Sequence, residues 1–370
     1  MRTHRSIAGW LAAGVALAAG VAAFAAQPDI PATQQQWRLV RGAGPGYALT
    51  LAEAPVRRPG AHEVLVRVRA ASLNRRDIFV QKGQYPISAG DSFVPLSDGA
   101  GEVVAVGPAV RRVRVGDRVA AAFFQTWLSG PITRAAFASA LGGGVDGMLS
   151  RYVTLHEDGL AKIPRELSFE EAATLPCAGV TAWNGLVTRG HTQPGDFVLL
   201  EGTGGVSVIG LQLAVALGAK PIITSSSDEK LARAHALGAV GMVNYRTTPE
   251  WEKPVLALTG DAGVRQVLEV GGKDTLAHAL ATLGQGAHVA LIGGLGGFGG
   301  DIPVMALLGR GANVSSIYVG SRADLEALLA FVHEHRIRPV VDRVFAYEDA
   351  AAAYELMESE RFFGKIVIRM

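Results

Sequence analysis

Short runs rich in apolar and β-branched residues fill the chain from Trp37 to about Pro164. Gly, Pro and Asp separate them, and these residues interrupt regular structure and form turns. The clearest runs are 63–73, 99–107, 116–124 and 151–155. This spacing predicts a compact, antiparallel, barrel-like domain over residues 37–166.

The period of the pattern changes from about Leu167 onward. Strand-like runs now alternate with helix-like runs such as 208–219 and 228–239. The strand-like runs are 197–202, 221–226, 241–245, 266–272, 288–294 and 313–320. Strands that alternate with helices predict a parallel, doubly wound α/β sheet, here over residues 167–320.

The tail from 321 to 370 begins with a helix pattern at 322–335. A strand, a helix and a second strand follow over 339–370. We expect this tail to return to the first domain and complete it.

Residues 1–25 have the three-part layout of a secretory signal peptide. Arg2 and Arg5 give a basic start, an alanine-rich apolar run begins at Ile7, and Ala23–Ala25 form a small-x-small cleavage site. An uncleaved membrane anchor and an over-long start of the chain are the alternatives. We expect an exported, periplasmic protein with no membrane attachment after cleavage, and a cytoplasmic one if the extension is not a signal.

Composition narrows the classes of function. Of the 370 residues, 49% are hydrophobic and 18% are charged, which is a globular balance. The net charge of +2 gives no basic surface for nucleic acid, so we expect no nucleic-acid partner. The single cysteine, Cys177, excludes an intramolecular disulfide and a zinc cluster built from thiolates.

The segment "GTGGVS" lies between a strand pattern and a helix pattern. Gly202 and Gly204 occupy the first two positions of a G-x-G-x-x-G loop and Ser207 the third, with Gly205 and Val206 between them. A helix amino terminus offers free N–H groups to a pyrophosphate. The pattern therefore predicts a dinucleotide site, and a plain tight turn is the alternative.

The second strand of this unit ends in "TSSS", residues 224–227, where an NAD site usually carries a carboxylate for the ribose 2′-OH. Asp228 and Glu229 look like first-turn helix residues, with Ser226 and Glu229 spaced as a capping box. Lys230 and the small hydroxyls suit a 2′-phosphate, because a phosphate needs donors and positive charge. We expect NADP in preference to NAD, and an ordinary solvated Lys230 is the alternative.

From Trp37 to Met370 the chain contains, in order, "SLNRRDIFVQKGQYP", "PLSDGAGEVVAVG", "VGDRVAA", "CAGVTAW", "GTGGVSVIGLQLAVALGA" and "SSSDEKLARAHALGA". Together these segments resemble the medium-chain dehydrogenase/reductase superfamily, in its zinc-free quinone oxidoreductase and enoyl reductase-like branch. The resemblance implies a GroES-like β-barrel domain, completed by the tail, and a Rossmann domain, with the catalytic cleft between them.

The resemblance also implies roles for individual residues. Ser226, Lys230 and Tyr245 match positions that hold the adenosine 2′-phosphate. Thr181 matches a position that contacts the nicotinamide carboxamide, and Gly293 matches the backbone that passes the nicotinamide. Arg361 lies near another 2′-phosphate arginine of the family.

Zinc-dependent members of the superfamily use two cysteines and a histidine with a nearby glutamate as catalytic ligands. The matching positions here are Asn74, Ser97 with Asp98, and Cys177. Because a catalytic zinc needs about three protein ligands, we expect no zinc. Cys177 is expected to be a small buried residue.

Hydride transfer to quinones or α,β-unsaturated carbonyls needs no metal, but the acceptor oxygen needs a donor. Asn74, which should face the nicotinamide, and Tyr85, which matches the proton donor of enoyl thioester reductases, are the candidates. Packing at the rim of a loop is the alternative for Tyr85. A zinc-free alcohol dehydrogenase and a non-catalytic NADPH-binding protein are the other functions considered. The strand at 313–320 should have a free edge, and in similar proteins this edge pairs with a second copy across a two-fold axis. We therefore expect a homodimer.

Overall fold

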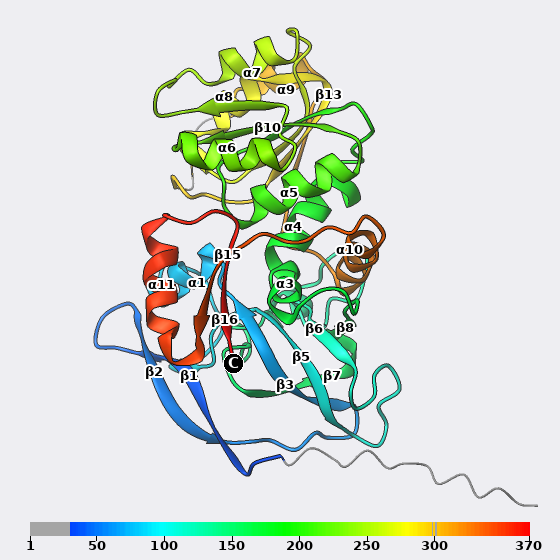
Figure 1. The fold of residues 1–370 in the computed structure, drawn as a ribbon. Coiled ribbons are helices and arrows are strands. Elements are labelled where there is room, and N and C mark those ends of the chain that lie inside the picture. Colours follow the sequence, from blue (N-terminus) through cyan, green and yellow to red (C-terminus); the bar gives the residue numbers. More distant parts are fainter. Residues whose placement is uncertain (1–29, 298, 300–301) are drawn as a thin grey trace, which may run out of the picture.

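Residues 30–297, 299 and 302–370 are described by the computed structural model, in which two sheets occupy opposite ends of the molecule (Figure 1). The signal-peptide prediction concerns residues outside these ranges. Within these ranges, no helix is both long and apolar enough to cross a membrane.

The first sheet has the strand order β15-β16-β3-β5-β6-β8, and β7 also pairs with β3. The carboxyl-terminal strand β16 runs antiparallel to β3, with Val367 opposite Ser72, so the tail does join the first part of the chain. The strands are β3 (Glu63–Ser72), β5 (Asp98–Val106), β6 (Arg118–Ala121), β7 (Tyr152–His156), β8 (Leu160–Lys162), β15 (Val341–Ala346) and β16 (Lys365–Arg369).

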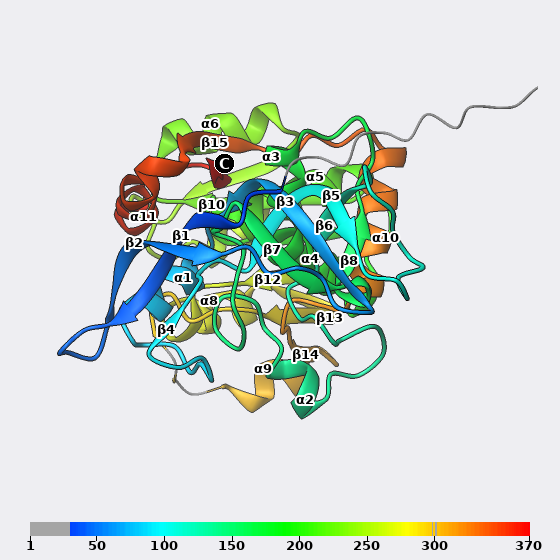
Figure 2. The ribbon, with the colours of Figure 1, turned by 90° about the horizontal axis from the view of Figure 1, so that it is seen from below.

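A smaller sheet of order β2-β1-β4 lies beside it, to the left of β3 in Figure 2. Its strands are β1 (Thr33–Arg41), β2 (Tyr47–Pro55) and β4 (Ser92–Phe93). The strand β1 begins four residues before Trp37, where the apolar pattern starts. The glutamines before Trp37 carry no alternation, but the Gln34 side chain hydrogen-bonds the backbone of Tyr152 through both its ends, at 2.7 and 3.0 Å.

The second sheet is parallel throughout and has the order β11-β10-β9-β12-β13-β14. This is the doubly wound Rossmann order, and it confirms the α/β fold class predicted from the sequence. The strands are β9 (Phe197–Leu200), β10 (Lys220–Ser225), β11 (Gly241–Asn244), β12 (Val264–Glu269), β13 (Leu283–Leu291) and β14 (Asn313–Ser316). Its helices are α5 (Gly205–Ala216), α6 (Asp228–Ala236), α7 (Glu252–Leu258), α8 (Leu276–Ala281) and α9 (Val304–Leu308).

A long irregular helix lies between the two sheets. It consists of α3 (Phe169–Ala173), a π-helical segment η2 (Leu175–Gly179), α4 (Val180–Trp183) and a second π-helical segment η3 (Asn184–Thr188). The remaining helices are α1 (Arg75–Gln81), α2 (Arg134–Phe137), α10 (Arg322–Glu334) and α11 (Ala350–Ser359), with short 3₁₀ turns at Glu157–Gly159, Gly272–Asp274 and Tyr347–Asp349.

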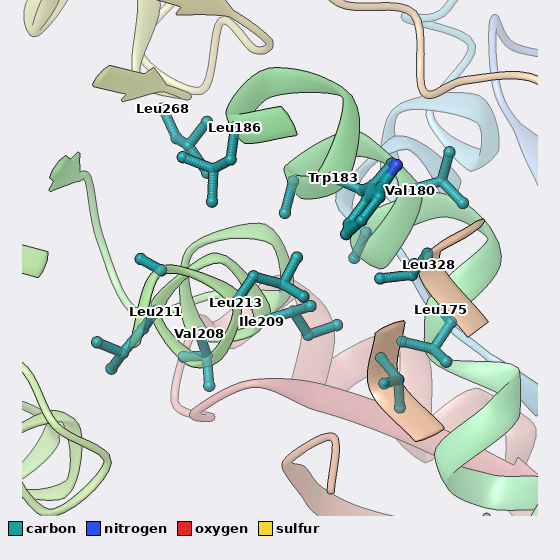
Figure 3. Close-up of a cluster of buried hydrophobic side chains, with 14 of the residues drawn as sticks. Leu175, Val180, Trp183, Leu186, Val208, Ile209, Leu211, Leu213, Leu268 and Leu328 are labelled. Atoms are coloured by element: carbon teal, nitrogen blue, oxygen red, sulfur yellow. The ribbon is translucent and has the colours of Figure 1, made fainter. Parts of the chain in front are cut away.

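The core around this helix fixes its position relative to the second sheet. Apolar side chains of the helix face those of α5, while Leu328 of α10 packs on the other side (Figure 3). Helix α5 is apolar on most of its surface, as expected for a helix that is covered on several sides. The irregular helix therefore carries Cys177 and Thr181 on a rigid support between the two parts of the fold.

Candidate active site

The glycine segment forms the strand–loop–helix turn that the sequence predicts. Strand β9 ends at Leu200, Gly202 has a φ of +72°, and α5 begins at Gly205. Gly204 is the N-cap, and no side chain caps the helix there. A methyl group on Gly202 or Gly204 would meet no atom within 4 Å. The loop thus leaves open space in front of a helix amino terminus, which is the geometry that accepts a pyrophosphate.

The neighbouring hydroxyls hold this loop in place. Ser207, at the third glycine position, is buried and donates to the carbonyl oxygen of Glu201 at 2.6 Å. The hydroxyls of Thr203 and Ser225 lie 3.2 Å apart, which ties the loop to β10. A serine in place of the third glycine therefore anchors the loop instead of disturbing it. Val206 follows in the first turn of α5, beside the loop.

The three candidates for a 2′-phosphate site gather at the carboxyl ends of β10 and β11. Ser225 pairs with Asn244 in the sheet, and the N–H of Tyr245 donates to the Ser225 carbonyl at 3.1 Å. Ser226 and Tyr245 thus follow directly on paired strand residues. Lys230 lies on α6, which begins three residues after Ser225.

The cap of α6 differs from the prediction. The N-cap is Ser227, whose hydroxyl accepts from the N–H of Lys230 at 3.4 Å, and the expected capping box of Ser226 with Glu229 is wrong. The helix begins one residue later than that spacing assumes, because the backbone of Ser227 is extended (φ −140°, ψ 124°) and Asp228 is the first helical residue. Ser226 therefore does not cap α6.

Lys230 is half-buried and its ammonium donates to the backbone oxygen of Glu360 at 2.7 Å. Burial is the main cause that lowers its pKa. The exposed Arg361 comes next in the chain, so this bond brings the tail to α6. Asp228, a carboxylate near the end of β10, accepts from the amide of Asn244 at 2.7 Å.

The other two cofactor candidates lie deeper. Thr181 is 3% exposed on α4. Gly293 follows β13, and a methyl group there would stand 2.6 Å from the backbone oxygen of Val270. Only glycine permits this close approach of the two loops.

At the positions where zinc-dependent relatives have metal ligands, Asn74 and Asp98 surround a lysine. Asn74 is the N-cap of α1, and its Oδ1 accepts from the ammonium of Lys365 at 2.6 Å. The same ammonium lies 3.7 Å from Asp98 Oδ2. The hydroxyl of Ser97 donates to Asp98 Oδ1 at 2.8 Å, and the N–H of Cys177 donates to Asp98 Oδ2 at 3.3 Å.

These side chains do not suit a zinc ion. Cys177 is the one thiol at these positions, and a catalytic zinc needs about three protein ligands. An amide, a hydroxyl and an ammonium take the other places. Among residues 30–297, 299 and 302–370, no three His, Cys, Asp or Glu side chains come close enough together to hold a metal.

Lys365 was not identified as a site residue from the sequence. It is the first residue of β16, only 2% exposed, and the apolar residues Ile366, Val367 and Ile368 follow it. The sequence signal that could have revealed it is a single lysine directly before an apolar strand pattern. Its partner Asn74 lies 291 positions away in the chain, so the pairing itself leaves no local pattern.

Tyr85 is half-buried and packs on an apolar cluster that includes Tyr47 and Phe93. The Arg76 guanidinium lies 5.3 Å from its ring centre and 4.9 Å from that of Phe123. This packing agrees with the alternative interpretation, in which Tyr85 packs at the rim of a loop.

A second group that the sequence did not reveal is a buried acid pair below the glycine loop. Glu201 Oε2 accepts from the N–H groups of Val270 and Gly271, and Glu269 Oε1 accepts from that of Gly272. One oxygen of Glu201 and one of Glu269 are buried without a hydrogen-bond donor in the described part of the chain. Burial and the neighbouring Glu269 raise the pKa of Glu201 well above its usual value.

Comparison with known proteins agrees with this architecture. Residues 60–165 match the family model of the alcohol dehydrogenase GroES-like domain, and residues 205–334 match that of the zinc-binding dehydrogenases. A zinc-type alcohol dehydrogenase-like protein of Schizosaccharomyces pombe is 43% identical over 314 residues, which cover 83% of this chain and 91% of that protein. Quinone oxidoreductase-like protein 2 of Bos taurus is 30% identical over 335 residues, 87% of this chain and 89% of that protein.

Solved structures give the same result. A protein of Sinorhizobium meliloti 1021 described as an alcohol dehydrogenase superposes with a TM-score of 0.87 at 41% identity, covering 92% of this chain and all of that one. An NAD-dependent alcohol dehydrogenase superposes with a TM-score of 0.81 at 34% identity over 91% of this chain and 99% of its own. The chain belongs to the medium-chain dehydrogenase/reductase superfamily. It is an NAD(P)-dependent oxidoreductase with a GroES-like domain and a Rossmann-like sheet.

Proposed function

We propose that this protein is a zinc-independent, NADP(H)-dependent reductase of quinones or α,β-unsaturated carbonyls, both small-molecule substrates. The observation that carries the proposal is the buried Lys365 ammonium, bonded to Asn74 where metal-dependent relatives have a ligand. The names of several relatives refer to zinc and to alcohols. The proposal differs from those names because of the side chains in this cluster.

The preference for NADP rests on the ends of β10 and β11. Ser226, Lys230 and Tyr245 offer hydroxyls and an ammonium, which suit a 2′-phosphate. The carboxylate of Asp228 is engaged by Asn244. Arg361, one residue beyond the partner of Lys230, adds positive charge on the same side. Gly202, Gly204, Gly205 and Val206 would hold the pyrophosphate, and Thr181 and Gly293 the nicotinamide end.

When bound, NADPH supplies the hydride that reduces the acceptor. Asn74 would donate from its amide to the acceptor oxygen, on which negative charge develops. The proton that completes the reduction would come from Tyr85 or from water. The protein would thus supply orientation and a donor instead of a Lewis acid.

A zinc-free alcohol dehydrogenase is the second candidate, and it is favoured by the words alcohol dehydrogenase in the names of the relatives. Alcohol oxidation requires a base for the hydroxyl proton, and an amide such as Asn74 cannot act as one. A non-catalytic NADPH-binding protein is the third candidate.

The experiment that separates these candidates is a panel of NADPH oxidation assays with quinones, enals and enones, run beside NADP reduction with alcohols. We expect turnover with one or more conjugated acceptors and none with alcohols. Turnover with alcohols alone would favour the second candidate, and tight NADPH binding without any turnover would favour the third.

A further inference from the structure

The ammonium of Lys365 makes two hydrogen bonds and one ion pair. It donates to the backbone oxygen of Leu73 and to Asn74 Oδ1, both at 2.6 Å, and it lies 3.7 Å from Asp98 Oδ2. The side chain is 2% exposed. A charge buried this deeply is costly unless it is paired, and Asp98, which is 0% exposed, balances it.

This contact decides which way the Asn74 amide points. An amide has an acceptor end and a donor end, whereas an ammonium only donates. Oδ1 must therefore face Lys365, and Nδ2 must face away from it. Nδ2 approaches Ser97 Oγ at 3.5 Å, which is the outer limit of a hydrogen bond. The Ser97 hydroxyl donates to Asp98 and can still accept this one long contact. The second amide hydrogen of Asn74 therefore has no acceptor among the described residues.

The stem of Lys365 also links this cluster to the cofactor loop. A methyl group on Gly205 would stand 2.5 Å from Lys365 Cδ, so the lysine passes directly against the first residue of α5. The loop and the tail meet in the same place, because Gly364 donates to the Thr203 carbonyl at 3.1 Å. Asn74 is thereby fixed relative to the loop that would hold the cofactor.

We propose that Lys365 is a positioning residue that orients and polarises the Asn74 amide, so that Asn74 Nδ2 donates to the oxygen of a carbonyl substrate. The inference rests on the proposed function and narrows it. A polarised amide stabilises an oxygen that gains negative charge, but it removes no proton from an alcohol. The cluster therefore suits a carbonyl acceptor better than an alcohol, and Lys365 places a positive charge where metal-dependent relatives place a cation.

A double-mutant cycle tests whether Lys365 acts through Asn74. Because Lys365→Met alone would leave Asp98 buried without a counter-charge, the test uses Lys365→Met with Asp98→Asn. Asp98→Asn alone keeps the hydrogen bonds of Lys365 to Leu73 and Asn74 but removes its counter-charge, so it shows how much of the effect on kcat comes from Asp98. We expect Asn74→Ala to lower kcat for a quinone or enone by about 100-fold, the usual effect of losing one oxyanion donor. The charge-balanced variant should lower kcat by a similar factor, and adding it to Asn74→Ala should have little further effect.

The affinity for NADPH separates positioning from a structural or phosphate-binding role. In the charge-balanced variant, the NADPH dissociation constant and the melting temperature should stay close to the wild-type values while kcat falls. Lys365→Arg keeps the positive charge, so its kcat should lie between that of the wild type and that of the charge-balanced variant. Effects on kcat that multiply with those of Asn74→Ala, or a loss of NADPH affinity as large as the loss of kcat, would overturn the proposal.

A readout without substrate distinguishes this inference from the proposed function. The side-chain amide resonance of Asn74, identified by its absence in Asn74→Asp, should shift in the charge-balanced variant but not in Asp98→Asn alone. An unchanged resonance would contradict the contact itself, whatever the activity. A shifted resonance in a protein that reduces none of the conjugated acceptors would instead overturn the proposed function and, with it, the role of Asn74 in catalysis.

Discussion

Lys230 is the residue on which the cofactor preference depends most. A charge-assisted hydrogen bond is worth roughly 1.5–3 kcal/mol, so Lys230→Ala should weaken NADPH binding by about tenfold or more. NADH lacks the 2′-phosphate, and its affinity should change little. Titration of both cofactors measures this. Lys220→Ala, at the opposite end of β10, is the control. Equal losses for the two cofactors, or a wild type that prefers NADH, would contradict the assignment.

Glu201 and Glu269 make the stability of the protein sensitive to alkaline pH. The pKa of Glu201 is raised in the folded state, so the stability it contributes is complete below its unfolded pKa and is lost as the pH rises through the folded one. Glu201→Gln supplies a permanent donor to Glu269. We expect equal stability of the two proteins in mildly acidic buffer, and an advantage of ~1–3 kcal/mol for the variant once the wild-type pair has ionised.

Thermal or denaturant unfolding across pH measures this effect, and Glu157→Gln provides a control of opposite sign. Burial works against ionisation of Glu157, but hydrogen bonds from the N–H groups of Arg111 and Arg112 prevail and lower its pKa to about 2. Its contribution is therefore present above its unfolded pKa and lost only as the pH falls toward 2. Glu157→Gln should destabilise the protein at neutral pH. A Glu201→Gln curve parallel to that of the wild type would contradict the raised pKa of Glu201.

The strand β14 and the helix α9 carry the expectation of a dimer. Strand β14 is an edge of the parallel sheet, and the nearby helix α9 exposes Val304, Met305 and Leu308 by 62, 74 and 69%. An open edge beside exposed apolar side chains favours pairing with a second copy across a two-fold axis. Light scattering at micromolar concentration should give a dimer, and Met305→Glu should shift it toward the monomer. Val215→Glu, at an exposed apolar residue of α5, is the control. A monomeric wild type would refute the expectation.

The elements that sequence reasoning finds most readily are those whose burial is uniform. Strand β9 is an unbroken apolar run because both faces of a parallel sheet are covered, and the parallel, doubly wound fold of the second sheet was predicted from the alternation of such runs with helices. The start of β1 was missed because its three glutamines show no apolar alternation, although they pair with β2 and the Gln34 side chain bonds the backbone of Tyr152. The glycine loop was found because a short, local pattern specifies it. Lys365 and the Glu201–Glu269 pair were missed because their partners are distant in sequence and meet only in the folded chain.

At the scale of the whole molecule, the predicted signal peptide implies that the exported protein needs a source of cofactor, because free NADPH is scarce outside the cytoplasm. We expect the mature chain to begin near Ala26 and to occur in the exported fraction of its host. Cell fractionation followed by amino-terminal sequencing tests this. An intact Met1 in the cytosolic fraction would show that the extension is not a cleaved signal.

The central claim is that a lysine–asparagine pair, and not a zinc ion, supports hydride transfer in this fold. The most direct test measures NADPH-dependent reduction of the best quinone or enone by preparations whose zinc content is determined by elemental analysis. The claim predicts less than stoichiometric zinc, full activity after exhaustive chelation and no gain on adding zinc. Activity that is lost with the metal and returns in proportion to about one bound zinc per chain would contradict it.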